Sequence, residues 1–398
     1  RDFFIADFLV AADEREEQVA EDPEEGFDFG ILEVDIRNVL VHYRGQFFQE
    51  DVLFEELRLG QVATWDPEAS TPLSIRARID ERVHSIEGEV RPLAASPGAE
   101  LALSFDAIEL APFETMLAEA GVAMIDGQFS ADAQLNVDAG AEGEATTAEV
   151  DGTFSFGNVT LDHTEVNLRK SDLSWDGRVT YQGDDAASEL TVAGQFNAGE
   201  LAVRVPQAAE DVAVDPGDAT NDEPAASPAG SAMTLTANAL AFEARSLTLA
   251  TAGDDSTVTA DTALELDGIE LEQGTNRVSL DAMRWDGGVD LALGGETPAG
   301  NVRGTLAMDT LSAAAPEGRV SATRVSLDNT DIVLAPSGRP DGIIVKTSAG
   351  VSELNVADGE DDMSAQVLSL AWTGTADLDL ADEGVTGGTD GELLVDGV

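Results

Sequence analysis

The sequence predicts an all-β protein made of one long, curved antiparallel sheet of repeated hairpins with a groove-like or half-barrel-like shape. Apolar and polar residues alternate over most of the chain, which is typical of strands with one apolar and one solvated face. Turn-forming Gly, Asp and Asn residues separate these stretches at about every eight to twelve residues. One-sided alternation indicates antiparallel pairing, because strands of parallel sheets are apolar on both faces.

The clearest strand pattern lies at residues 125–137, where Ile125, Phe129, Leu135 and Val137 share one parity and polar residues occupy the other. The same pattern recurs at Leu101, Leu103 and Phe105, at Phe154 and Phe156, at Leu190, Val192 and Phe196, and in the ranges 201–205, 264–266, 289–293 and 302–308.

One segment departs from alternation and predicts a short helix near residues 112–120. Pro112 suits a first helical turn, Phe113 and Leu117 share a helical face, and Gly121 supplies a stop.

The order of these patterns predicts five regions. Residues 206–231 are rich in proline and poor in large apolar residues, so we expect a disordered linker there. The expected regions are an N-terminal strand with an acidic connector at 1–26, a first β domain at 27–138, its continuation at 139–205, the linker at 206–231 and a second β segment at 232–398.

Tryptophan marks a weak internal repeat. The segments 152–175, 262–285 and 349–372 align without gaps, and each ends in Trp. Asp-Gly follows Trp175 and Trp285, and Thr-Gly follows Trp372. Because Asp-Gly favours the positive φ angles of a type I′ turn, we expect Trp175 and Trp285 each to end a strand at a two-residue hairpin.

Composition excludes several classes of function. A net charge of −57 argues against a nucleic-acid partner, because affinity for phosphates depends on Lys and Arg. The chain has no cysteine and no recognisable nucleophile or nucleotide motif, so we expect no enzymatic activity and no cofactor.

No metal site is expected from the histidines. His42, His84 and His163 lack metal-ligand spacing and are interpreted as solvent-facing strand residues. Calcium binding by the acidic runs 253–255 and 358–362 is left open, although their spacing does not match a calcium loop.

The apolar parity is the remaining candidate functional surface. It could pack against a second sheet as a sandwich core, or it could line an open groove that holds acyl chains. The candidate lipid-contacting residues are Leu101, Leu103, Phe105, Ile125, Phe129, Leu135, Val137, Phe154, Phe156, Leu190, Val192 and Phe196.

The N-terminal third of the chain resembles a known family. The runs FGILEVDIRNVLVHYRGQFF, DVLFEELRLG and VHSIEGEVRPL precede LALSFDAIELAPFETMLAEAGVAMIDGQFSADAQLNV, in which Pro112-Phe113 and Gly127-Gln128-Phe129 occupy characteristic places. This stretch, residues 27–137, is similar to the AsmA-like family, in particular to its branch of periplasmic proteins with a DUF748 domain. The remaining chain shares only the general style of strands and turns.

The resemblance implies a function in outer membrane biogenesis. Relatives of this kind have an inner-membrane anchor and a periplasmic β-sheet whose hydrophobic groove is thought to carry phospholipids between the inner and outer membranes of a Gram-negative bacterium. The expected partners are phospholipid acyl chains, the inner membrane and unidentified envelope proteins. The sequence itself has no run of 18 apolar residues and no signal peptide. Because the resemblance implies an inner-membrane anchor, we expect the chain to be a segment of a longer, membrane-anchored protein. The alternative is a structural or adhesive β-repeat module of an acidic extracellular protein.

Overall fold

The computed structural model confirms the all-β fold class. It describes residues 28–397 except for 45–48, 119–121, 142, 164–166, 185, 206–232, 254, 295–297, 337–338, 340–341, 359–363 and 382–383. The described strands are β1 (Gly30–Ile31), β2 (Val34–Arg44), β3 (Gln49–Leu59), β4 (Val62–Ala63), β5 (Thr71–Ile79), β6 (Arg82–Arg91), β7 (Gly98–Glu109), β8 (Val122–Asp138), β9 (Thr146–His163), β10 (Asn167–Gly183), β11 (Ala187–Val205), β12 (Met233–Ala252), β13 (Asp255–Gln273), β14 (Asn276–Ala292), β15 (Ala299–Ala315), β16 (Gly318–Leu334), β17 (Gly342–Asp358), β18 (Ser364–Ala381) and β19 (Gly384–Asp396).

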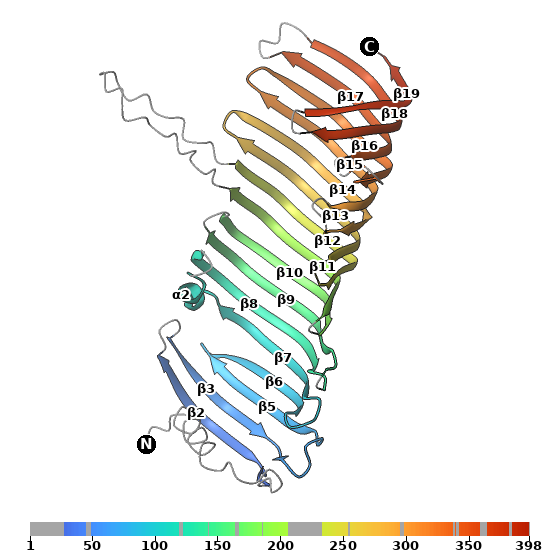
Figure 1. The fold of residues 1–398 in the computed structure, drawn as a ribbon. Coiled ribbons are helices and arrows are strands. Elements are labelled where there is room, and N and C mark those ends of the chain that lie inside the picture. Colours follow the sequence, from blue (N-terminus) through green and yellow to red (C-terminus); the bar gives the residue numbers. More distant parts are fainter. Residues whose placement is uncertain are drawn as a thin grey trace, which may run out of the picture.

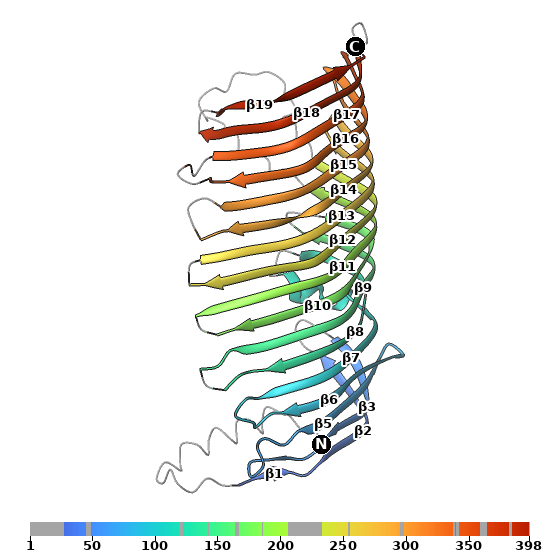
Figure 2. The same cartoon turned by 90° about the vertical axis from the view of Figure 1, so that its right-hand side faces the viewer.

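The large sheet follows the order of the chain. From β2 to β19, with only β4 left out, each strand pairs antiparallel with the next, and β1 pairs with β4 in a separate two-stranded sheet. The strands lie across the long axis of the molecule, with β2 near one end and β19 near the other (Figure 1). Each long strand curves along its length, so the sheet has the shape of a trough (Figure 2).

The expected linker at 206–231 and the expected region 1–26 lie outside the described residues. The strands on either side of the linker are nevertheless direct neighbours in the sheet. Val205 at the end of β11 pairs with Met233 at the start of β12, and the pairing continues to Ala187 and Ala252. The sheet is therefore continuous across the position of the linker.

The strands are longer than the turn signals suggested. The stretches around Phe196 and 201–205 were expected as separate strands, yet both belong to β11. Glu200 lies between them with a left-handed φ of 38°. The register is the same on both sides, because Gly199 pairs with Ala239 and Leu201 pairs with Ala237. The strand thus changes parity at Glu200 without ending, and its apolar residues stay on one face.

Left-handed residues form a line across alternate strands. The line takes one residue each from β7, β9, β11, β13, β15 and β17: Ala107, Asn158, Glu200, Gly268, Thr310 and Glu353. Polar side chains on neighbouring strands bond to the backbone there: Asp172 accepts from the Asn158 N–H at 2.7 Å, and Ser130 Oγ accepts from the Ala107 N–H at 2.8 Å. The Asn, Asp and Gly residues that resemble turn signals therefore include residues of this line.

The expected helix is present and short. A 3₁₀ turn at Ala111–Phe113 leads into α2, a single α-helical turn at Glu114–Leu117, in the connection between β7 and β8. It lies beside the sheet near β8 (Figure 1).

The hairpin prediction at the tryptophans was wrong. Asp176 and Gly177 lie inside β10, where Gly177 pairs with Gly194 of β11. Asp286-Gly287 and Thr373-Gly374 are likewise inside β14 and β18. Glycine is required at these places by close packing and not by a turn, as the next subsection describes.

Candidate functional site: the apolar face

Cross-strand pairing places the predicted lipid-contacting residues on one face of the sheet. Phe129 pairs with Phe156, and Phe196 pairs with Trp175. The remaining predicted residues join them through pairs such as Leu101 with Leu135, Leu103 with Ala133, Phe105 with Ala131, Val137 with Ala148, Ala131 with Phe154, Leu190 with Tyr181, Val192 with Val179 and Ile125 with Leu161. We call this surface the apolar face.

The apolar face extends beyond the predicted residues into the C-terminal strands. One row of paired residues crosses thirteen successive strands of the sheet, from β7 to β19, and we call it the central row. Its members are Phe105, Ala131, Phe154, Trp175, Phe196, Phe242, Leu264, Trp285, Leu306, Leu327, Ala349, Trp372 and Leu393. At roughly 4.8 Å between strands, the row is about 60 Å long.

The central row could have been predicted from the sequence only if the register between neighbouring strands had been known. Phe242 and Leu327 were missed because a long strand can change parity without ending, as β11 does at Glu200, so alternation alone does not align distant strands. Trp175, Trp285 and Trp372 were noticed as a repeat, but Trp175 and Trp285 were assigned to strand ends.

The large side chains of the apolar face are only half-buried. This holds for all twelve predicted residues. The buried hydrophobic residues among the described part of the chain are nearly all alanine, with Val159 and Ile269 the largest. A sandwich core would bury its Leu and Phe side chains fully. The described strands form one large sheet and the small β1–β4 pair, so no second sheet made of them covers this face.

A second row, made of small residues, runs beside the central row, and we call it the small-residue row. It comprises Ala133, Gly152, Gly177, Gly194, Ala244, Thr262, Gly287, Gly304, Thr330, Thr347, Gly374 and Gly391. Ala133 and Ala244 are each 2% exposed, and the hydroxyls of Thr330 and Thr347 are 2.8 Å apart and buried.

The small-residue row indicates which way the sheet is folded. A Cβ atom placed on Gly194 would lie 2.5 Å from the backbone oxygen of Asp176, and one on Gly304 would lie 2.6 Å from that of Asp286. Real Cβ atoms essentially never approach so closely. The backbone of the neighbouring strand is therefore crowded against this row on the side of the apolar face. Crowding of this kind occurs on the concave side of a bend, so we place the apolar face on the inner side of the trough.

Aromatic residues cluster at the N-terminal part of the apolar face. The ring of Phe129 lies 5.0 Å from that of Phe156 and 6.5 Å from that of Phe154, measured between ring centroids. These separations are those of favourable aromatic pairs.

The opposite face is polar and strongly acidic. Arg245 donates to Asp261 and Asp286, each at 2.5 Å. The bond to Asp286 raises the pKa of Arg245 most, and the negative charge of Asp261 raises it further. Arg339 donates to Asp377 and Asp379 in the same manner. Arg245 thus bridges carboxylates on β13 and β14, and Arg339, between β16 and β17, binds two on β18. Acidic residues outnumber basic ones by 78 to 21, so most carboxylates have no basic residue to match them.

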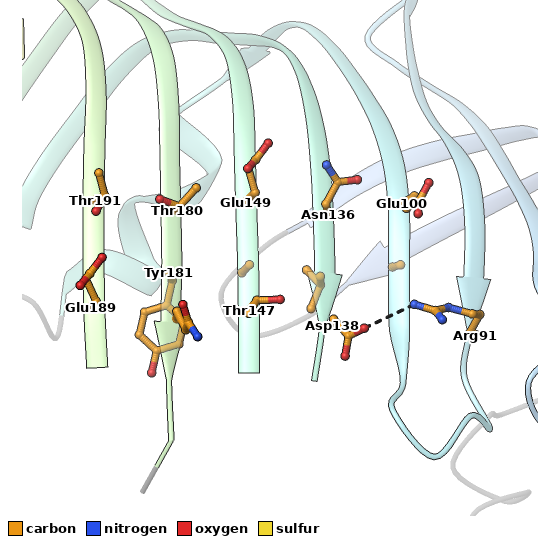
Figure 3. A pocket seen from close by; sticks show the side chains of 14 residues that line it. Arg91, Glu100, Asn136, Asp138, Thr147, Glu149, Thr180, Tyr181, Glu189 and Thr191 are labelled. Carbon is orange, nitrogen blue, oxygen red and sulfur yellow. Dashed lines mark hydrogen bonds and ion pairs between the residues drawn. The ribbon is translucent and has the colours of Figure 1, made fainter. Parts of the chain in front are cut away.

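A pocket near the ends of β6–β11 draws much of its lining from this polar face (Figure 3). Glu100, Asn136, Glu149, Thr180 and Thr191 follow one another there through successive strand pairs. Its one basic lining residue is Arg91, which lies 3.5 Å from Asp138. Bonds from the Ser96 hydroxyl and the Gly140 N–H, together with Arg91, lower the pKa of Asp138.

The interpretation of the histidines as solvent-facing was wrong for His84. Its side chain is 5% exposed, its ring lies 6.2 Å from that of Phe105, and its Nδ1 accepts the Asp106 N–H at 3.3 Å. Burial lowers the pKa of His84. His42 is exposed as expected and lies 2.9 Å from Asp51.

Within the described ranges, no group of three or more His, Asp or Glu side chains is arranged to hold a metal ion. The acidic loop residues 359–363 are outside those ranges. No helix in the described part of the chain is long and apolar enough to cross a membrane.

Comparison with known proteins adds no assignment: no protein-family model, curated protein or solved structure matches this chain.

Proposed function

We propose that this chain is a segment of a cell-envelope protein whose apolar face holds or conducts phospholipid acyl chains. The observation that carries the proposal is the apolar face itself: large aliphatic and aromatic side chains, half-buried, that no second sheet covers within the described structure. Soluble proteins rarely leave so large an apolar surface without an occupant.

The physical mechanism is passive. An acyl chain that lies along the central row removes apolar surface from water, on both the chain and the protein, and gains about 25 cal/mol per Å² buried. Head groups stay in water at the open side of the trough. Lipids can then move along the row because Leu, Val and Phe side chains offer contact without directional bonds that must be broken.

The resemblance of residues 27–137 to the AsmA-like, DUF748-type proteins supports the same function and extends it. On that basis the protein is proposed to act in the periplasm, between the inner and outer membranes, as part of a membrane-anchored whole. The proposed role is transport without catalysis, and it requires no cofactor.

Native mass spectrometry of the purified chain tests the proposal. Protein isolated from a Gram-negative host is expected to carry phospholipid, seen as mass increments that disappear after delipidation and return on incubation with phosphatidylethanolamine. A chain that stays free of phospholipid before and after this incubation contradicts the proposal and favours a structural or adhesive module.

A further inference from the structure

The three tryptophans of the central row recur at a fixed interval in the sheet. Trp175, Trp285 and Trp372 lie on β10, β14 and β18, which is one tryptophan every four strands. Their spacing along the chain is unequal mainly because residues 206–232 fall within the first interval. The weak sequence repeat is therefore a regular structural repeat of four strands.

Each tryptophan has the same surroundings. The glycine two residues later pairs with a glycine on the next strand, as in Gly177 with Gly194, Gly287 with Gly304, and Gly374 with Gly391. A register shift follows the first two glycine pairs, between β11 and β12 and between β15 and β16.

The indole rings lie over these glycine pairs. A Cβ atom on Gly177 or Gly194 would be 2.9 or 2.7 Å from Cζ2 of Trp175. For Trp285, a Cβ atom on Gly287 would be 2.6 Å from Cζ2 and one on Gly304 would be 2.6 Å from Cη2. Side chains at these positions would lift the ring, so the glycines let each indole lie down on the sheet as a broad, half-buried apolar surface.

The interval between the tryptophans has the scale of one acyl chain. Four strands at roughly 4.8 Å span about 19 Å. A bilayer core of about 30 Å contains two leaflets, so an acyl chain in one leaflet reaches about 15 Å. A single chain that lies along the trough is therefore about as long as one interval, so successive tryptophans of a filled trough fall on successive chains.

We infer that Trp175, Trp285 and Trp372 are three equivalent contact sites for hydrocarbon chains, each occupied by a different acyl chain when the trough is filled. The occupant follows from the surface: it lies on the inner side of the trough, continues for about 60 Å of apolar side chains, and belongs to a protein of net charge −57 that would repel an anionic partner. This inference rests on the proposed function and adds how many acyl chains bind along the tryptophans and where each one lies.

Fluorescence quenching by phosphatidylcholine with brominated acyl chains tests the inference. Four variants each keep one tryptophan and carry Trp→Phe at the other three positions. Trp65 is the matched control, because it follows β4 of the small two-stranded sheet, away from the central row, and is 54% exposed. Circular dichroism verifies that each variant is folded.

The expected result is loss of emission for the variants that keep Trp175, Trp285 or Trp372, at one common lipid-to-protein ratio, and unchanged emission for the variant that keeps Trp65. Native mass spectrometry of the same samples counts the bound lipids. Lipid bound with quenching of only one central-row tryptophan, or of none, overturns the inference and leaves the proposed function standing. Absence of bound lipid in every variant and in the parent protein overturns both.

Discussion

Gly194 shows how one residue determines local architecture. Its Cα faces the backbone of β10 and the ring of Trp175 so closely that a methyl group has no room. Gly199, five residues later in the same strand, has no atom within 4 Å of the position of its missing Cβ. The two glycines are chemically identical, and only the sheet around them separates a required glycine from a tolerated one.

Gly194→Ala is expected to lower the free energy of unfolding by about 1–3 kcal/mol, because the added methyl group forces the neighbouring strand and the indole apart. Gly199→Ala serves as the matched control and is expected to be neutral or slightly stabilising, because alanine restricts the unfolded chain. Urea denaturation followed by circular dichroism measures both. Equal effects of the two substitutions would contradict the close packing of Trp175 on its glycine pair.

His84 gives the apolar face a pH-dependent element. Burial lowers the pKa of His84, so the unfolded chain binds a proton more readily than the folded chain does. The contribution of His84 to the free energy of unfolding is therefore fully present above the unfolded pKa of about 6.5. It declines as the pH falls below that value. Chemical denaturation between about pH 7.5 and 5.5 should show this decline, and His84→Gln should reduce it. An identical pH profile for the variant would show that His84 is not the cause.

The long strands are the elements that build the apolar face, and each has two differently exposed sides. Leu135 lies on the apolar face, paired with Leu101 and Val150, and Gln134 precedes it on the polar face. Leu135 is half-buried and Gln134 is exposed. A charge introduced at either position can still reach water, because no second sheet of described strands covers the trough.

Leu135→Asp is therefore expected to reduce the amount of bound lipid, by loss of the acyl chain nearest β8, while it lowers the free energy of unfolding only moderately. Gln134→Asp, its neighbour on the polar face, should leave lipid retention unchanged and lower the free energy of unfolding slightly, because Gln134 pairs with Asp151. Lipid extraction with mass spectrometry and urea denaturation measure the two effects. Unfolding of the Leu135→Asp protein under native conditions would indicate a closed core in place of an open trough.

The sequence allowed one face of each strand to be predicted but not the length of the strands. Alternation placed Phe129 and Leu135 together with Phe154 and Phe196, because side-chain parity is a local property of a strand. Strand ends were misplaced because Gly, Asp and Asn suit both a hairpin turn and a mid-strand residue with positive φ, as at Gly268 and Asn158. Only long-range pairing distinguishes these uses. The same ambiguity made Trp-Asp-Gly resemble a turn, although it marks the four-strand repeat.

The molecule as a whole is a single curved layer with unequal faces. Its outer charges include arginine bridges such as that of Arg245 with Asp261 and Asp286, but acidic residues outnumber basic ones by 78 to 21. Salt weakens both the favourable bridges and the repulsion between carboxylates. Since the unmatched carboxylates are the larger population, repulsion dominates the balance.

Added sodium chloride is accordingly expected to raise the melting temperature, with the largest gain at low ionic strength, where the screening length changes most. Differential scanning calorimetry across a salt series measures this shift. A melting temperature that falls with added salt would mean that the arginine bridges outweigh the carboxylate repulsion.

The claim that the apolar face holds acyl chains is tested most directly by site-specific photocrosslinking. A photoreactive phenylalanine derivative placed at Leu135 should form covalent adducts with phospholipid when the protein is illuminated in cells, and the mass of the adduct identifies the lipid. The same group at Gln134 should form none. Adducts of equal yield at both positions, or protein adducts alone at Leu135, would contradict the account.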